Sequence, residues 1–150
     1  MKRVLVFLSV LISAASLAQE PVLVDSAGFD DIIDGKKVVL YTISGGGLTM
    51  QVTNFGGRVV SLFVPDRDGN IVDVVLGHNT LDEYVNYKKE RFLGAVVGPV
   101  ANRITDAQYT WKGTTYHLAR NYGTVTLHGG FKGLDFQVWD VEEVTANSIT

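Results

Sequence analysis

Residues 48–76 read LTMQVTNFGGRVVSLFVPDRDGNIVDVVL, and the pattern of this stretch decides the fold class. Its first six residues alternate between apolar and polar side chains, which is the period-2 pattern of a half-buried strand. Gly56-Gly57 interrupts the pattern, and an apolar run from Val59 to Val64 follows and ends at a proline. Asp66 to Asn70 has the composition of a tight turn, and a second apolar run extends from Ile71 to Leu76. The stretch therefore predicts three strands, of which the last two form a hairpin.

Short apolar runs separated by turn residues continue on both sides of this stretch. They predict further strands at Lys37 to Ile43, Phe92 to Val97, Gln108 to Trp111, Thr114 to Leu118 and Phe136 to Val144. The sequence Thr80-Leu81-Asp82-Glu83 fits a capping box and predicts one or two helical turns over residues 81–86. Many short strands with almost no helix are typical of an antiparallel sandwich or barrel. We therefore expect an all-β chain that forms an antiparallel β-sandwich.

Composition and charge exclude several classes of protein. The chain has 150 residues, with 13 Lys plus Arg, 16 Asp plus Glu, three His and no Cys. The net charge of −3 has the wrong sign for a nucleic-acid surface, which needs clustered basic side chains. The lack of Cys removes disulfide scaffolds, thiolate metal sites and cysteine nucleophiles. We expect one globular domain that has no nucleic-acid partner.

The first 18 residues have the composition of a secretory signal peptide. The basic start Met1-Lys2-Arg3 precedes an uncharged, mostly apolar run from Val4 to Ala18. Small residues stand at positions −3 and −1 of a cut between Ala18 and Gln19. The run is shorter than the ~20 residues that a membrane-spanning helix requires. We expect residues 1–18 to be removed and residues 19–150 to be exported to the periplasm or outside the cell, with no membrane partner after cleavage.

Several polar motifs fit structural roles better than chemistry. The sequence from Asp66 to Asn70 resembles the start of a calcium loop, but an EF-hand needs an acidic residue at its twelfth position, where this chain has Gly77. Gly45-Gly46-Gly47 lacks the Lys-Ser/Thr that follows the glycines of a phosphate-binding loop. His78 and His117 each stand without a partner of matching spacing. We therefore expect no metal site and no cofactor.

Two glycine-interrupted segments combine polar side chains that suit a small polar ligand. The segment Gly98 to Ile104 presents Asn102 and Arg103 side by side, and the segment Asn121 to Gly130 places His128 before two glycines. Glycines allow a ligand to approach the main chain closely. Amide, guanidinium and imidazole groups together offer the donors and acceptors that sugar hydroxyls require. The residues alone leave open whether these segments form a polar ligand site or serve only the fold.

The order of the motifs along the chain resembles that of the aldose 1-epimerases (galactose mutarotases). The matching motifs are Asn54-Phe55-Gly56-Gly57, Val64-Pro65-Asp66 with Gly69, Asp73 to Gly77, Tyr84, Asn102-Arg103-Ile104, Gly113 with Tyr116 and Leu118, and Leu127 to Gly130 with Gly133 and Trp139. No single motif is decisive, but the ordered set is highly specific. The chain departs from the family pattern at Pro99, where the family usually has Arg, and over Leu134 to Gln137. Neither departure falls on a sugar-facing position, although Pro99 affects the local loop.

The resemblance implies a fold, an activity and a set of site residues. The implied fold is a large antiparallel β-supersandwich, of which this chain is the N-terminal part. The implied activity is isomerisation between the α and β anomers of free aldoses such as galactose and glucose. In this family a general base Glu and a general acid His open the sugar ring, and both are expected beyond residue 150, so that no catalytic residue lies within this chain. Asn102, Arg103 and His128 are expected to bind the sugar.

The end of the chain leaves two interpretations. Asn147-Ser148 is a predicted turn, and Ile149-Thr150 is the start of a strand that the sequence does not complete. Since an unpaired strand edge is a liability, this ending favours a truncated chain. One interpretation is therefore the front portion of an exported aldose 1-epimerase, inactive by itself. The alternative is a noncatalytic carbohydrate-binding β-sandwich module that is complete as given.

Overall fold

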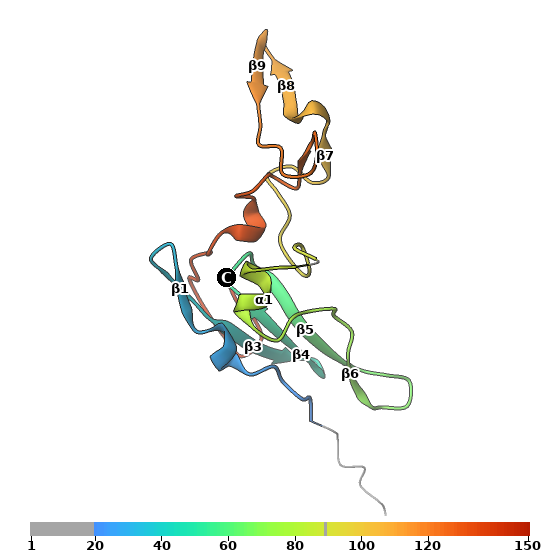
Figure 1. Cartoon of the computed structure of the whole chain (residues 1–150). Coiled ribbons are helices and arrows are strands. Elements are labelled where there is room, and N and C mark those ends of the chain that lie inside the picture. Colours follow the sequence, from blue (N-terminus) through green and yellow to red (C-terminus); the bar gives the residue numbers. More distant parts are fainter. Residues whose placement is uncertain (1–19, 89) are drawn as a thin grey trace, which may run out of the picture.

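A four-stranded antiparallel sheet is the largest element of the computed structural model, which describes residues 20–88 and 90–150 (Figure 1). Its strand order is β3-β4-β5-β6, and the strands are Leu40–Gly45, Leu48–Thr53, Arg58–Pro65 and Ile71–Asp73. Strands that follow one another in sequence pair with one another, so three successive hairpins build the sheet. The prediction for the stretch 48–76 is confirmed, with a last strand shorter than expected. The expected signal peptide, residues 1–18, lies outside the described residues.

Three small antiparallel sheets and four short helical elements complete the described structure. The sheets pair β1 (Asp31–Ile33) with β2 (Lys36–Val38), β7 (Arg103–Ile104) with β10 (Thr126–Leu127), and β8 (Gln108–Trp111) with β9 (Thr114–His117). The helical elements are η1 (Ser26–Phe29), α1 (Leu81–Val85), η2 (Thr105–Ala107) and η3 (Leu134–Phe136). Figure 1 shows the β8–β9 hairpin standing away from the four-stranded sheet. Because every strand pair of the described residues is antiparallel, the all-β antiparallel class is confirmed.

The core lies between the four-stranded sheet and the helical elements η1 and α1. Its buried side chains are Phe29, Val38, Leu40, Phe55, Val60, Leu81, Tyr84 and Val138. The predicted capping box starts α1, since the Thr80 N–H and hydroxyl both donate to the Glu83 carboxylate at 3.1 Å. Burial raises the pKa of Tyr84, whose hydroxyl accepts the His78 N–H at 2.8 Å. No helix among the described residues is long and apolar enough to cross a membrane.

The strand predicted for Phe92 to Val97 is wrong. The chain turns at Leu93-Gly94, and Gly94 has a φ of +64°. The Gly94 carbonyl accepts the Val59 N–H at 3.0 Å, and a Cβ at Gly94 would overlap with the main chain of Val59. The Val96 N–H also donates to the Gly56 carbonyl at 3.0 Å. This segment therefore docks through two isolated main-chain hydrogen bonds and does not form a ladder, which its apolar composition alone could not reveal.

The strand predicted for Phe136 to Val144 is also wrong. The segment begins in η3 and then runs beside the chain that follows β4, where Val138 forms a single bridge with Phe55. Gly56 N–H donates to the Gln137 carbonyl at 2.7 Å, and Trp139 N–H donates to the Asn54 carbonyl at 2.9 Å. Apolar side chains of this segment thus pack against the core, while its main chain makes isolated hydrogen bonds and no continuous ladder.

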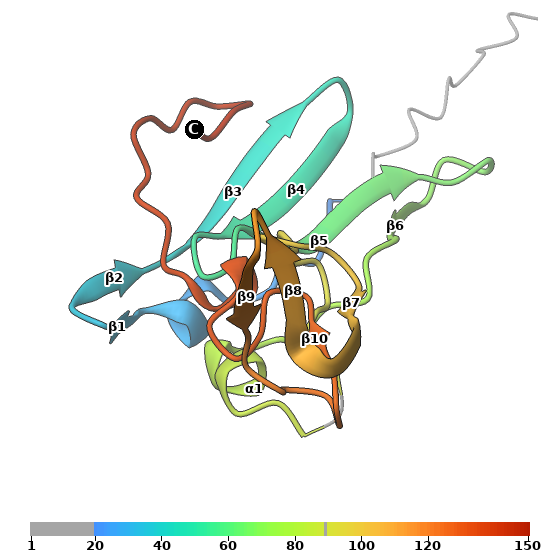
Figure 2. The same ribbon diagram turned by 90° about the horizontal axis from the view of Figure 1, so that it is seen from above.

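The last described residues form the predicted turn. Thr145 N–H donates to the Ser148 carbonyl at 2.9 Å, and Val144 pairs with Ile149 in an isolated bridge. The Ser44 N–H donates to the Ala146 carbonyl at 2.8 Å, so that this turn lies beside β3, as Figure 2 shows. The turn chemistry of Asn147-Ser148 was therefore interpreted correctly.

Candidate functional site

The two polar segments singled out in the sequence meet in the β7–β10 ladder. Thr126 pairs with Ile104 and Leu127 pairs with Arg103. One position further along, the His128 N–H donates to the Asn102 carbonyl at 2.9 Å. The ladder thus brings Asn102, Arg103 and His128 together, as a shared sugar site requires, although these segments are separated in the sequence.

A close main-chain contact joins the same two segments at their other end. Gly129 has a φ of +89°, and a Cβ there would overlap with the Gly98 carbonyl and the ring of Pro99. The Gly98 carbonyl also accepts the Leu134 N–H at 3.0 Å. Only glycine meets both demands at position 129, because an L side chain is strained at this φ and has no room here. Pro99, which departs from the family pattern, is exposed at this junction.

Arg103 projects its charge from the surface of this loop pair. Its Nη1 donates to the Asn102 Oδ1 at 2.9 Å, and its Cζ lies 5.3 Å from the centroid of the Tyr122 ring. These two contacts orient the guanidinium group, and its other N–H groups make no hydrogen bond with the described residues. An oriented guanidinium with several available donors suits a hydroxyl-rich or anionic ligand.

His128 is half-buried and is held from two sides. Its Nδ1 accepts the Asn102 N–H at 3.0 Å. The Phe92 ring contacts the imidazole edge to face, with 4.6 Å between ring centroids. These contacts fix the plane of the imidazole ring beside Arg103.

A cleft of about 350 Å³ lies over these residues, and this volume is within the range of small-molecule sites. Its lining residues are Tyr87, Glu90, Arg91, Phe92, Arg103, Asn121, Tyr122, Leu127 and His128. Two of the three expected site residues therefore line the cleft. The third, Asn102, lies beside them and supports both, through its side chain for Arg103 and through its main chain for His128.

Seven lining residues were not expected as site residues, namely Tyr87, Glu90, Arg91, Phe92, Asn121, Tyr122 and Leu127. Tyr122 lies inside a segment that was singled out, so an aromatic side chain next to the polar residues was an available signal. Tyr87, Glu90, Arg91 and Phe92 carried no such signal, because their approach to the cleft depends on contacts distant in sequence. Glu90 supplies a carboxylate, whose Oε1 accepts the N–H of Phe92 at 3.1 Å.

Asn121 shapes the cleft wall through its amide. Its Nδ2 donates to the Leu127 carbonyl at 2.9 Å, and its Oδ1 accepts the Leu127 N–H at 2.8 Å. These two bonds take the place of a neighbouring strand on the outer side of β10. Both polar ends of this side chain are therefore occupied by the fold.

A buried ionic cluster, formed by Arg58, Arg91 and Asp135, lies behind the cleft. Arg91 donates from Nε and Nη2 to the two Asp135 carboxylate oxygens at 2.7 and 3.1 Å. Arg58 donates to the Asp135 carbonyl at 3.0 Å and to the Arg91 and Leu93 carbonyls at 2.9 Å. Burial lowers the pKa of Arg58, and the Asp135 charge opposes this effect. The cluster connects β5, the segment at Arg91 and the turn at η3.

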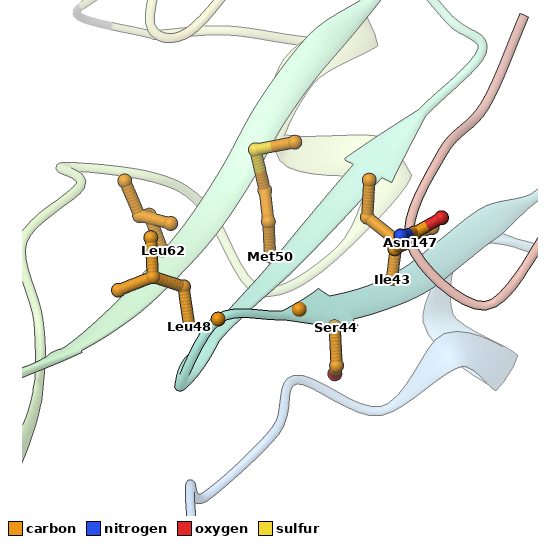
Figure 3. Close-up of a pocket in the computed structure, with 8 residues that line it drawn as sticks. Ile43, Ser44, Leu48, Met50, Leu62 and Asn147 are labelled. Carbon is orange, nitrogen blue, oxygen red and sulfur yellow. The ribbon is translucent and has the colours of Figure 1, made fainter.

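A second hollow of about 400 Å³ lies on the four-stranded sheet (Figure 3). Ile43, Met50 and Leu62 are cross-strand neighbours there, and Leu48 stands next to them. No residue that lines this hollow carries a charge or a titratable side chain. It therefore lacks the groups needed for acid–base chemistry or for binding a charged ligand.

The acidic turn between β5 and β6 has a structural role. The Asp66 carboxylate accepts the N–H groups of Asp68 and Asn70 at 2.8 Å and the Asn70 side-chain amide at 3.1 Å. Hydrogen bonding, above all from the Asn70 side chain, holds the pKa of Asp66 below its usual value. Within residues 20–88 and 90–150, no three His, Asp or Glu side chains gather as a metal site would require. Asp66 thus closes the hairpin turn.

Comparison with known sequences places these features in a family. The family model for aldose 1-epimerase matches residues 39–150. Galactose mutarotase from Rattus norvegicus is 37% identical over 115 residues, which are 77% of this chain and 33% of that protein. The probable aldose 1-epimerase from Arthroderma benhamiae is 37% identical over 115 residues, which are 74% of this chain and 26% of that protein. The chain therefore spans about a quarter to a third of the length of these relatives.

Solved structures agree with the sequence matches. A GalM/aldose epimerase homologue from C. elegans has a TM-score of 0.68 and 35% identity, covering 73% of this chain and 34% of that one. Galactose 1-epimerase from Lactobacillus acidophilus has a TM-score of 0.60 and 28% identity, covering 75% of this chain and 32% of that one. The motif resemblance, the family match and the shared fold agree, and the chain belongs to the aldose 1-epimerase family.

Proposed function

We propose that this chain supplies the sugar-binding surface of an aldose 1-epimerase, an isomerase that interconverts the α and β anomers of free aldoses such as galactose and glucose. The observation that carries the proposal is the cleft in which Arg103 and His128 stand together, with Asn102 supporting both. Family membership supports the same activity.

The reaction requires two proton transfers. A general base takes the proton of the anomeric hydroxyl while a general acid protonates the ring oxygen, so that the bond between the anomeric carbon and the ring oxygen breaks and an aldehyde forms. Rotation about the C1–C2 bond and reclosure give the other anomer. Positioned acid–base groups contribute about 10²–10⁴-fold to such a reaction. We place the Glu and the His that perform these transfers C-terminal to residue 150.

Within this chain, Arg103 and His128 bind the substrate. The Arg103 guanidinium, oriented by Asn102 and Tyr122, donates hydrogen bonds to sugar oxygens and stabilises negative charge that develops as the ring opens. The His128 imidazole provides a second donor next to it. Glu90, the carboxylate among the lining residues, is tied to the Phe92 main chain, and we assign it no proton transfer.

Polarimetry with α-D-galactose tests the proposal. The chain alone is expected to give no acceleration of mutarotation, whereas a full-length enzyme that contains this sequence is expected to be active. In that enzyme His128→Ala and Arg103→Ala are each expected to lower kcat by about 10²-fold or more. Wild-type rates from residues 19–150 alone would overturn the placement of the acid–base pair, and near-normal kinetics in both variants would make these positions structural.

The alternative, a noncatalytic carbohydrate-binding module, makes a different prediction. A module would bind a sugar with full affinity as this chain alone, and its coding sequence would end after Thr150. An open reading frame that continues to a later His and Glu supports the epimerase. Family membership favours the epimerase.

We also propose that the protein is exported after cleavage near Ala18-Gln19. The basic start and the uncharged run of residues 4–18 support this. N-terminal sequencing of the protein from an exporting bacterial host is expected to begin at Gln19. A chain that retains Met1 and stays in the cytoplasm would contradict it.

A further inference from the structure

The end of the β7–β10 ladder departs from the regular antiparallel pattern. In such a ladder, a hydrogen-bonded residue pair exchanges two N–H···O=C bonds. At the pair Asn102 and His128, the His128 N–H donates to the Asn102 carbonyl at 2.9 Å, as the pattern requires. The returning bond goes elsewhere, because the Asn102 N–H donates to His128 Nδ1 at 3.0 Å. The imidazole thus takes the place of the His128 carbonyl.

Two left-handed residues make this substitution possible. Asn102 has a φ of +64° and His128 a φ of +52°. Positive φ is uncommon for residues other than glycine, although Asn and His adopt it more often than most, and such conformations recur at functional sites. Both residues leave the extended conformation at the same rung, which turns the His128 side chain back toward the Asn102 N–H. The two left-handed residues therefore leave the Nδ1 of His128 occupied by a hydrogen bond.

An occupied Nδ1 determines which nitrogen carries the proton. A neutral imidazole has one N–H and one acceptor nitrogen, and a proton on Nδ1 would leave two N–H groups facing each other across 3.0 Å. The proton therefore belongs on Nε2, which makes no hydrogen bond with the described residues. The Phe92 ring, 4.6 Å away, holds the imidazole plane.

We propose that the main-chain N–H of Asn102 sets the tautomer of His128, so that Nε2 presents a proton to a sugar oxygen in the cleft. Asn102 is then a positioning residue that acts through His128, and His128 is a hydrogen-bond donor and not the base of the reaction. The sugar contact rests on the proposed function. The tautomer does not, since the contacts that set it are all within this chain.

Nitrogen-15 NMR of the ring tests the tautomer without any sugar. In the chain labelled with ¹⁵N-histidine, long-range ¹H–¹⁵N correlations at a pH where the rings are neutral are expected to show His128 with a protonated Nε2 and an unprotonated Nδ1. The exposed His117 on β9, whose ring has no hydrogen bond to the described residues, is the internal control and is expected to show both forms in exchange. A His128 ring protonated on Nδ1, or averaged like His117, would overturn the inference.

Two changes at position 102 separate the main chain from the side chain. Replacing the Asn102 amide by an ester puts an oxygen in place of the N–H and keeps the side chain. The change is expected to produce tautomer exchange at His128 and, in a full-length enzyme, about tenfold weaker galactose binding. Asn102→Gly keeps both the N–H and the positive φ, and is expected to keep the Nε2–H ring. If the ester variant still shows His128 with only Nε2 protonated, the Asn102 N–H does not set the tautomer of His128.

Galactose titrations of a full-length enzyme that contains this sequence distinguish the two proposals. A full-length enzyme that has the Nε2–H ring and binds no galactose contradicts the proposed function and leaves the tautomer assignment standing. An enzyme that binds galactose while His128 has an Nδ1–H ring contradicts the tautomer assignment and leaves the proposed function standing.

Discussion

The buried ionic cluster and the open cleft use the same kind of residue in opposite ways. In the cluster, the arginines and Asp135 are at most 6% exposed, and their hydrogen bonds go to one another and to main-chain carbonyls. In the cleft, Arg103 is exposed. Its guanidinium donates a hydrogen bond to the Asn102 side chain and lies over the Tyr122 ring. A buried arginine here serves the scaffold, whereas an exposed, oriented arginine is available to a ligand.

Asp135→Asn is expected to cause the largest loss in the free energy of unfolding. The change leaves two buried guanidinium groups without their anion, and breaking a buried ion pair in this way costs about 3–5 kcal/mol. Equilibrium unfolding in urea measures the loss. The exposed pair Lys36–Asp140, with an N···O distance of 2.7 Å, is the control, and Asp140→Asn is expected to cost about 0–1 kcal/mol. Equal losses in both variants would contradict the view that the cluster holds the scaffold.

A smaller loss of stability is expected from Gly129→Ala, which disrupts the close contact between Gly129 and Gly98. Alanine at a φ of +89° is strained by about 1–3 kcal/mol, and its Cβ also overlaps with the Gly98 carbonyl. Gly69→Ala is a matched control, because Gly69 has a φ of +85° and no atom within 4 Å of the added carbon. Urea unfolding is expected to show a larger loss for Gly129→Ala. Equal losses would mean that the close approach contributes nothing.

Arg103→Ala is expected to separate binding from stability. As an exposed change it should alter the free energy of unfolding by no more than about 0.5 kcal/mol. Galactose affinity is expected to fall by about tenfold or more, because charged hydrogen bonds are worth roughly 1.5–3 kcal/mol. Arg67→Ala changes an exposed arginine outside the cleft and should leave binding unchanged. A large loss of stability in Arg103→Ala would place Arg103 with the scaffold.

The smallest effect on stability is expected from Asp66→Ala in the turn between β5 and β6, which lies outside both the cluster and the cleft. The lowered pKa of Asp66 means that its ionised form stabilises the folded state above the unfolded pKa, and that this contribution is lost as pH falls through the folded pKa. Asp66→Ala should therefore be slightly less stable than wild type at neutral pH, with the difference shrinking in acid. Thermal unfolding at several pH values measures it. A difference that grows in acid would contradict the assigned hydrogen bonds.

Local patterns were enough to predict the hairpins of this fold and the start of α1. The alternation in β4 and the turn from Asp66 are set by neighbouring residues, and the capping box at Thr80 is equally local. The segments 92–97 and 136–144 failed as strands because distant main-chain groups decide their conformation. Apolar composition cannot distinguish a packed coil from a strand.

The site shows the same division. Arg103 and His128, which line the cleft, could be singled out because polar residues in glycine-interrupted segments are a local signal. The Arg91–Asp135 pair spans 44 residues in sequence, and Phe92 was interpreted as part of a strand, so their support of the cleft follows only from the fold. The tautomer of His128 likewise depends on a rung that joins two separated segments.

The way in which β7 and β10 are joined affects how readily this site can change. Main-chain pairing at Thr126–Ile104 and Leu127–Arg103, together with the amide of Asn121, holds the cleft walls. The side chains of Arg103 and Tyr122 therefore carry little of the fold. Saturation libraries at these two positions should yield mostly folded proteins, which makes this part of the cleft a surface where ligand preference can change at small structural risk.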